Sequence, residues 1–229
     1  MSLKFLRATL LVIGICLLIS PINAKEKSKL PETTKDGLVL QHHTKLGAVY
    51  LKPGASLAEY DKVKIVDCYV AFEKNWQRNF NRDSIDLAEH VTTQEMQKIK
   101  DKLAAEFPIV FTKVLEKGGY QVVDEVGEDV LLLRPAIINL TVTAPDLPSA
   151  GIKREIVASN GSMTLYMEMY DSQTSAKFAE VIDAEEVGQN GFAQEANRVS
   201  NKFEFDQTLE SWAKILLKRL DEAHGKAKT

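Results

Sequence analysis

The stretch that decides the fold is DVLLLRPAIINLTVT, residues 129–143. From Ala136 onward its apolar side chains occupy alternate positions, which is the pattern of a β-strand with one buried face. The alternating apolar residues are Ala136, Ile138, Leu140 and Val142. Arg134 and Pro135 interrupt the pattern, so we expect a bulge or an exposed edge there. A strand of this length predicts a sheet at the centre of the protein.

More strands are predicted on both sides of this stretch. Residues 162–170, SMTLYMEMY, alternate strictly, with four apolar side chains on one face. Residues 177–187 follow a short turn and are expected to return as the hairpin partner. Residues 62–72, KVKIVDCYVAF, are rich in β-branched and aromatic residues and predict one interior strand. Shorter strands are expected within residues 37–60 and 120–123.

Two amphipathic helices complete the pattern. The first begins at a capping box formed by Thr92 and Glu95 and ends at a Gly-Gly pair. The second runs from about Phe203 to His224, with apolar residues three and four positions apart. The order β-α-β-β-β-β-α predicts an α+β domain of two layers. Its mixed or mostly antiparallel sheet carries both helices on one face.

The N-terminal residues have the features of an export signal. Lys4 and Arg7 precede an apolar run that ends near Ile19, and Ala24 supplies a small residue for cleavage. The run is shorter than the ~20 residues of a membrane-spanning helix, so we expect no membrane span in the mature protein. An uncleaved N-terminal anchor is the alternative. Ile15 directly before Cys16 does not fit lipid attachment, which favours a soluble exported form.

The predicted organisation is a signal peptide (1–24), a flexible leader (25–36), a single domain (37–225) and a short tail (226–229). Without the signal peptide, 27 of the 29 basic residues stand against 32 acidic ones, a formal charge of −5. The sequence contains no basic patch, and its acidic balance argues against nucleic acid as a partner. Cys68 is then the single cysteine, so no intramolecular disulfide is expected, and its apolar neighbours predict a buried, unreactive side chain.

Residues 73–84, EKNWQRNFNRDS, form the first candidate for a binding surface. We interpret them as a loop. Aromatic and arginine side chains of this kind anchor protein interfaces. The candidate contacts are Trp76, Arg78, Asn79, Phe80 and Arg82. The alternative is a Trp lid that closes one end of the core while the polar residues bond loop carbonyls.

The second candidate surface is the open face of the sheet, where Tyr166 and Tyr170 are expected beside Asn139 and Thr141. Tyrosine side chains on such a face are a plausible docking surface. Open faces also occur without any partner, so this surface is a hypothesis.

No motif in the chain specifies a reaction, a cofactor or a metal. His90 lies near Asp86 and Glu89, a base with orienting carboxylates in one reading and a polar approach to the Thr92 cap in the other. The adjacent His42 and His43 would point to opposite faces of a strand, which disfavours a shared metal. The methionines of residues 162–170 are read as core packing in preference to a soft-metal site.

Several segments, in order, resemble the bacterial envelope family called domain of unknown function 3313. They are DGLVL, YLKPGASLAEYDKVKI, WQRNFNR, EKGGYQVVD, DVLLLRPAIINLTVTAPD, SNGSMTLYMEMYDSQTS and NRVSNKFEFDQTLESWAKILLKRLD. The resemblance covers nearly all of the mature chain and implies a small exported protein, often lipid-anchored, without an established activity. The element order is also similar to periplasmic α+β domains of outer-membrane assembly and secretion lipoproteins, a likeness of fold that does not carry function.

These observations predict a periplasmic or secreted protein of the cell envelope, with association with the outer membrane as a further alternative. Its expected role is non-enzymatic: binding or adapting to an envelope protein or a cell-wall component. Two other classes stay open. One is a hydrolase that acts on an envelope substrate. The other is a carrier of a small apolar ligand between helices and sheet, where methionines suit a plastic pocket.

Overall fold

The computed structural model describes residues 30–84, 90–143, 155–157, 161–187, 194–196 and 198–226. Within these ranges the strands are β1 Val39–Leu40, β2 Ala48–Leu51, β3 Lys62–Ile65, β4 Tyr69–Phe72, β5 Gln121–Val122, β6 Val130–Val142, β7 Glu155–Val157, β8 Gly161–Asp171, β9 Lys177–Val187 and β10 Gln194–Ala196. The helices are α1 Trp76–Asp83, α2 Thr93–Lys117 and α3 Arg198–Ala223. The predicted α+β class is confirmed.

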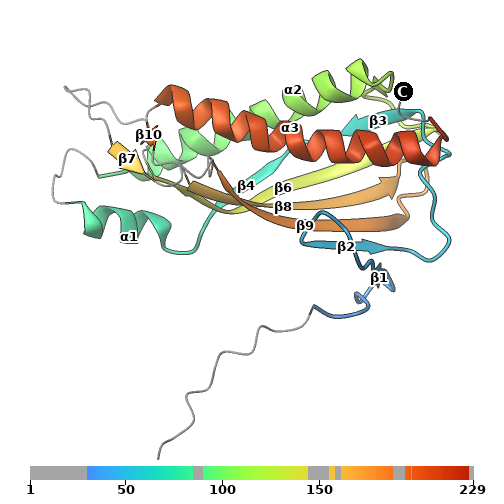
Figure 1. Cartoon of the computed structure of the whole chain (residues 1–229), viewed down its shortest axis with the longest axis horizontal. Coiled ribbons are helices and arrows are strands. Elements are labelled where there is room, and N and C mark those ends of the chain that lie inside the picture. The colour runs from blue at the N-terminus through green and yellow to red at the C-terminus, as the bar shows by residue number, and fades with distance from the viewer. Residues whose placement is uncertain are drawn as a thin grey trace, which may run out of the picture. The chain divides into compact units, whose positions relative to one another are not determined.

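Eight of the strands form one mixed sheet in the order β1-β2-β9-β8-β6-β3-β5, and β4 pairs with β6 beyond β3. β8 is antiparallel to both of its neighbours, β9 and β6, whereas β3 and β4 run parallel to β6. β7 and β10 pair separately as a two-stranded sheet. As predicted, β6 occupies the middle of the large sheet (Figure 1).

The buried face of β6 differs from the predicted one. Asn139 has a left-handed backbone with φ of 52°, and the register with β8 shifts between Ile138 and Thr141. This bulge reverses the side-chain phase, because one extra residue moves every later side chain to the other face. The buried residues are therefore Leu131, Leu133, Pro135 and Ile137 before the bulge and Leu140 and Val142 after it. The expectation that Ala136 and Ile138 share one face with Leu140 is wrong.

The register of β6 with β8 is unbroken through Arg134 and Pro135, so the bulge expected there is absent from this pairing. Pro135 instead lies opposite a break on the other side of β6, where the predicted single strand 62–72 is divided into β3 and β4. A proline fits at this break because no neighbouring strand needs its missing N–H. Cys68, in the break, is buried as expected, and burial raises the pKa of its thiol to about 12.

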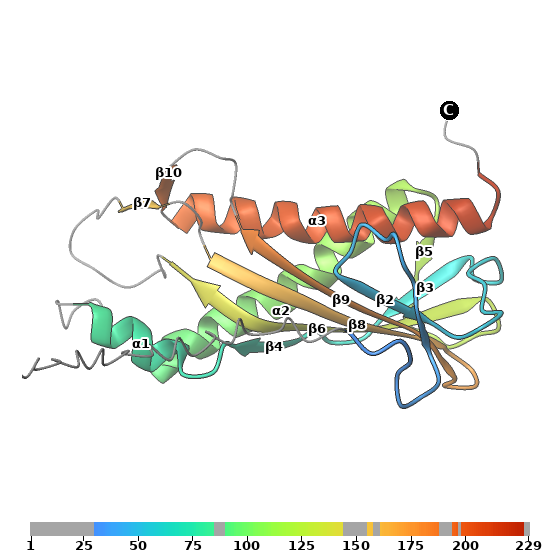
Figure 2. The ribbon, with the colours of Figure 1, turned by 60° about the horizontal axis from the view of Figure 1, so that its bottom comes forward.

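The helices α2 and α3 lie on the same face of the sheet, as predicted (Figures 1 and 2). α2 begins at the predicted capping box, in which the Thr92 hydroxyl accepts the Glu95 N–H and the Glu95 carboxylate accepts the Thr92 N–H. The helix continues through Pro108 to Lys117. The apolar faces of both helices join the buried side of β6, β8 and β9 in one core.

Candidate functional site

Residues 76–83, predicted as part of a loop, form helix α1. Trp76 opens the helix and is only 7% exposed. Its ring stacks on Phe72 of β4, with 4.5 Å between centroids, and on Phe80 one turn later, at 5.2 Å. Stacked aromatic rings bury a large apolar area. Trp76 therefore closes one end of the core, which is the lid of the alternative interpretation.

The polar residues of α1 hold the chain that leads into α2. Asn81 makes two hydrogen bonds with the backbone of Val91, accepting its N–H at 2.8 Å and donating to its carbonyl at 3.0 Å. Gln77 donates to the same carbonyl at 2.9 Å. His90 directly precedes this anchored residue, whereas its proposed partners Asp86 and Glu89 lie outside the described residues.

The other predicted contacts of this segment lie on its surface. Arg78, Asn79 and Arg82 are exposed, and Arg82 donates to Asp83 at 2.9 Å. Phe80 is half-buried because it packs against Trp76. A partner surface at α1 would therefore consist of exposed polar side chains, with the aromatic rings serving the core beneath them.

The two tyrosines of the second predicted surface are half-buried on the sheet face away from α2 and α3. Both hydroxyls donate to Glu168, from Tyr166 at 3.2 Å and from Tyr170 at 2.9 Å. Burial by itself would raise the pKa of Glu168, but the hydrogen bonds from Tyr170, Lys177 and Tyr166 hold it below its usual value. Thr141, predicted on the same face, bonds to Ser162 at 2.9 Å.

Lys177 joins this face to the N-terminal segment. Its side chain, 15% exposed, contacts Glu168 and Glu180 at 3.2 Å each and also pairs with Asp36. Burial would lower the pKa of Lys177, but its three carboxylate partners raise it. Leu38 packs beside Ala48 and Tyr50 in a small second core. The segment around Asp36 and Leu38 thus covers part of the face that was predicted to be open.

A groove lies on the opposite face of the sheet, between β2, β9, β8 and α3. Its floor is made of two rows of apolar side chains that cross β2, β9 and β8. One row is Val49, Val181 and Met167, and the other is Leu51, Ala179 and Met169. Side chains paired across strands point to the same face, so these rows form one continuous apolar layer. Its members on β8 and β9 are buried in the main core, and Val49 and Leu51 of β2 are partly exposed.

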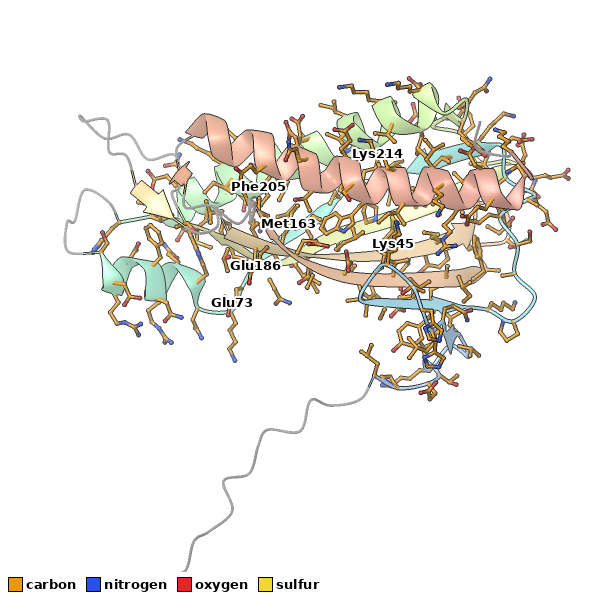
Figure 3. The ribbon with its side chains drawn as sticks, viewed as in Figure 1. Lys45, Glu73, Met163, Glu186, Phe205 and Lys214 are labelled. Carbon is orange, nitrogen blue, oxygen red and sulfur yellow. The ribbon has the colours of Figure 1, made fainter. Side chains whose placement is uncertain are left out.

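The walls of the groove come from α3 and two loops. Trp212, Ile215 and Leu216 of α3 line one side, Leu46 comes from the loop between β1 and β2, and Leu57 comes from the loop after β2. The groove encloses about 770 Å³, within the range of small-molecule sites. Figure 3 shows the β1–β2 loop reaching toward α3, with Lys45 at its tip.

Asp183 fixes the geometry of this groove. It is 5% exposed, and one carboxylate oxygen accepts the Nε1–H of Trp212 at 2.8 Å. The other accepts the backbone N–H of Gly47 at 2.7 Å. A buried carboxylate needs such donors because it has lost its contact with water. The side chain thereby joins α3 and the β1–β2 loop to the same point on β9.

The rim of the groove carries several cations: Lys45, Lys214, Lys218 and Arg219. Lys214 pairs with Glu210 at 2.9 Å, and Lys218 and Arg219 share Glu222, at 3.3 and 2.9 Å. His42 and His43 also line the groove, and His42 contacts Glu32 at 3.3 Å. No Asp or Glu is among the described residues that line it.

The titratable groups in and near the groove are few. Within the described ranges, no three His, Cys, Asp or Glu side chains are grouped closely enough to hold a metal ion. Outside the lining, burial and the neighbouring Asp183 raise the pKa of Glu185. The two carboxylate oxygens of Asp183 accept hydrogen bonds from Gly47 and Trp212. The described helices also include none with the length and hydropathy needed to cross a bilayer.

The sequence reasoning missed the groove. One signal is the sequence of β2, AVYL, which is apolar at every position and therefore has two faces that can be buried. Its two faces enter two different environments: Ala48 and Tyr50 join the small core, and Val49 and Leu51 form the groove floor. The second signal was the i, i+4 spacing of Lys214 and Lys218 beside Ile215, which places cations along an apolar wall.

Comparison with solved structures gives several distant matches. A PelC dodecamer from Paraburkholderia phytofirmans is 12% identical, with a TM-score of 0.33 and coverage of 72% of this chain and 97% of that one. A minor lipoprotein from Acinetobacter baumannii is 8% identical, with a TM-score of 0.33 and coverage of 73% and 95%. A Xanthomonas campestris protein of the family DUF330 is 14% identical, with a TM-score of 0.35 and coverage of 77% and 94%. Likenesses this distant carry no argument about function.

Comparison with sequences is more specific. No curated protein matches the chain. A family model does match residues 34–216, which span all of the strands and most of α3. This range contains most of the segments on which the family resemblance was based. The chain therefore belongs to the family described as "Protein of unknown function (DUF3313)".

Proposed function

We propose that this protein is an exported component of the bacterial cell envelope that binds an apolar ligand in the groove without transforming it. The observation that carries the proposal is the groove floor. Six apolar side chains of β2, β9 and β8 lie in two rows, and the groove above them has a volume of about 770 Å³. A continuous apolar surface of this kind favours apolar ligands because their contact with water is lost on binding.

The composition of the groove supports binding over catalysis. Acyl transfer needs a nucleophile, a base and an orienting group within hydrogen-bond reach of one another. The polar groups that line the described part of the groove are a threonine, two serines, a glutamine, two histidines and the four cations, and the adjacent carboxylate of Asp183 is bonded to the fold. The proposal therefore selects the carrier among the three classes that the sequence left open.

The test is binding of a neutral apolar dye, Nile red, followed by its fluorescence and by displacement with hexadecanol. Ala55 lines the groove and is exposed, so Ala55→Phe fills the groove with little effect on the core. Ala58 is exposed and does not line it, so Ala58→Phe is the matched control. We expect Ala55→Phe to weaken dye binding at least tenfold and Ala58→Phe to leave it unchanged. Equal binding by both variants, or no binding by the unmodified protein, would refute the proposal.

Export is proposed from the N-terminal sequence and is tested separately. We expect the protein in the periplasmic or secreted fraction, with a mature N-terminus at Lys25 by intact mass. A mass that retains residues 1–24 would support an uncleaved anchor. Recovery of the full-length chain from the cytosol would contradict export.

A contact of α1 with an envelope protein or the cell wall is a second proposal, favoured by its exposed side chains Arg78 and Asn79. Crosslinking in envelope extract should lose a partner when both are changed to Ala, and should keep it when exposed Lys35 and Lys52 are changed in the same way. An unchanged set of crosslinked proteins excludes α1 as the contact.

A further inference from the structure

We infer that the ligand of the groove is an anionic amphiphile with a single apolar chain. The chain lies on the floor made by β2, β9 and β8, and the anionic head contacts the cations at the rim. This inference rests on the proposed function and adds the chemical class of the ligand.

The first argument is the charge of the lining. The whole chain carries more acidic than basic residues, with a formal charge of −3. Four cations nevertheless line the groove, and the described lining includes no carboxylate. The carboxylates that contact three of these cations, Glu210 and Glu222, lie outside the lining. Four cations against these two carboxylates leave a formal excess of two positive charges at the rim (4 − 2), which is complementary to a ligand of negative charge.

The second argument is Lys45. It is exposed at the tip of the β1–β2 loop and forms no ion pair or hydrogen bond with any residue that the structure describes (Figure 3). The loop that carries it is not free to move away, because Gly47, two residues later, donates to the buried Asp183. A cation is thus held at the rim by the fold and has no partner in the part of the chain that the structure describes. An anionic head is the ligand group that would pair with it.

The third argument concerns shape. The two apolar rows lie side by side across three strands, and the cations lie on α3 and on the loop above them. A ligand that satisfies both regions needs an apolar part and a charged end in one molecule. A small inorganic anion would make no use of the apolar lining, and a neutral hydrocarbon would leave Lys45 without a counter-charge.

The experiment compares three probes with the same chain length: palmitate, hexadecanol and hexadecyltrimethylammonium, each below its micelle concentration. The protein has two tryptophans, so Trp76→Phe leaves Trp212, which lines the groove, as the single fluorescent reporter. We expect palmitate to bind about tenfold more tightly than hexadecanol, and the cationic probe to bind more weakly than either. Rising salt should weaken palmitate binding and leave hexadecanol binding unchanged.

Two variants locate the head. The double variant Lys45→Glu/Lys214→Gln should lower the affinity for palmitate about fivefold or more and leave the affinity for hexadecanol unchanged. Lys74→Glu changes an exposed lysine outside the groove and should affect neither. Equal affinity for palmitate and hexadecanol overturns the anionic inference while the proposed function stands. Absence of binding by all three probes overturns both. A ligand-free dimer that Ala55→Phe dissociates would show that a second copy occupies the groove, and this also overturns the inference.

Discussion

The hydrogen bond between Trp212 and Asp183 gives the most direct test of which contacts fix the geometry of the groove. Trp212 is 3% exposed and donates its Nε1–H to Asp183 at 2.8 Å. Trp212→Phe keeps an aromatic ring and removes this donor. The carboxylate then retains its bond from Gly47 and loses the other. A hydrogen bond to a charged group contributes about 1.5–3 kcal/mol, and a smaller ring adds a cavity cost of about 1 kcal/mol.

The expected loss of unfolding free energy is thus about 3 kcal/mol, which lowers Tm by about 6–12 °C for a chain of this size. Urea unfolding followed by circular dichroism measures the loss, and an unchanged m value shows that the unfolded state is comparable. The same substitution is then made in an Asp183→Ala background. There the donor has no acceptor to lose, so only the packing cost of about 1 kcal/mol should remain.

The difference between the two backgrounds isolates the hydrogen bond. If Trp212→Phe costs the same in both, within about 0.5 kcal/mol, Asp183 is not stabilised by Trp212 and our account of the groove is incorrect. Binding of Nile red provides an independent measurement, because the same carboxylate holds the loop that forms one wall.

Three further predictions concern other parts of the fold. Thr92→Ala should cost about 1 kcal/mol in urea unfolding at pH 7 by removing the cap of α2. Hydrogen bonds from the Thr92 backbone and hydroxyl lower the pKa of Glu95. The stability that these bonds contribute is therefore present above the usual glutamate pKa of about 4.3 and is lost as pH falls through the lowered pKa. If the cost of Thr92→Ala does not shrink below about pH 4, the capping box is contradicted. Lys177→Met should lower the free energy of unfolding by about 2 kcal/mol at pH 7, because Glu168 and two other carboxylates lose their shared cation. A change under about 0.5 kcal/mol would show that these charges are fully hydrated. Gly161→Ala should lower Tm more than the same substitution at an exposed glycine does, because a Cβ at Gly161 collides with a backbone carbonyl of β6 and the φ of Gly161 is 142°. Equal melting temperatures for the two variants would exclude this close approach.

Elements set by local chemistry could be predicted from the sequence. The capping box marks the start of α2 because both of its bonds join residues three positions apart. The alternation of β8 gives the buried face correctly, since Met163, Leu165, Met167 and Met169 are all buried. The family could also be predicted, because its motifs are linear. The two-layer arrangement followed from the lengths and order of these elements.

Tertiary contacts decided the rest. The segment 76–83 reads as a loop because its composition is polar, but stacking of Trp76 on Phe72 and bonds from Asn81 to Val91 give it a helix and a structural role. The bulge at Asn139 was not predicted at its true position, since it depends on the register of β6 against β8.

The groove was beyond prediction for the same physical reason. Its floor joins residues 49–51, 165–169 and 178–181, and its wall comes from residues 211–223. Local sequence shows that each of these segments is apolar on one side, and it determines their secondary structure. Which of those sides are covered, and where a groove remains between α3 and the sheet, is determined by packing between segments that are distant in the sequence. Residues 49–51 lie more than a hundred residues before the other three segments, and no local pattern records such contacts.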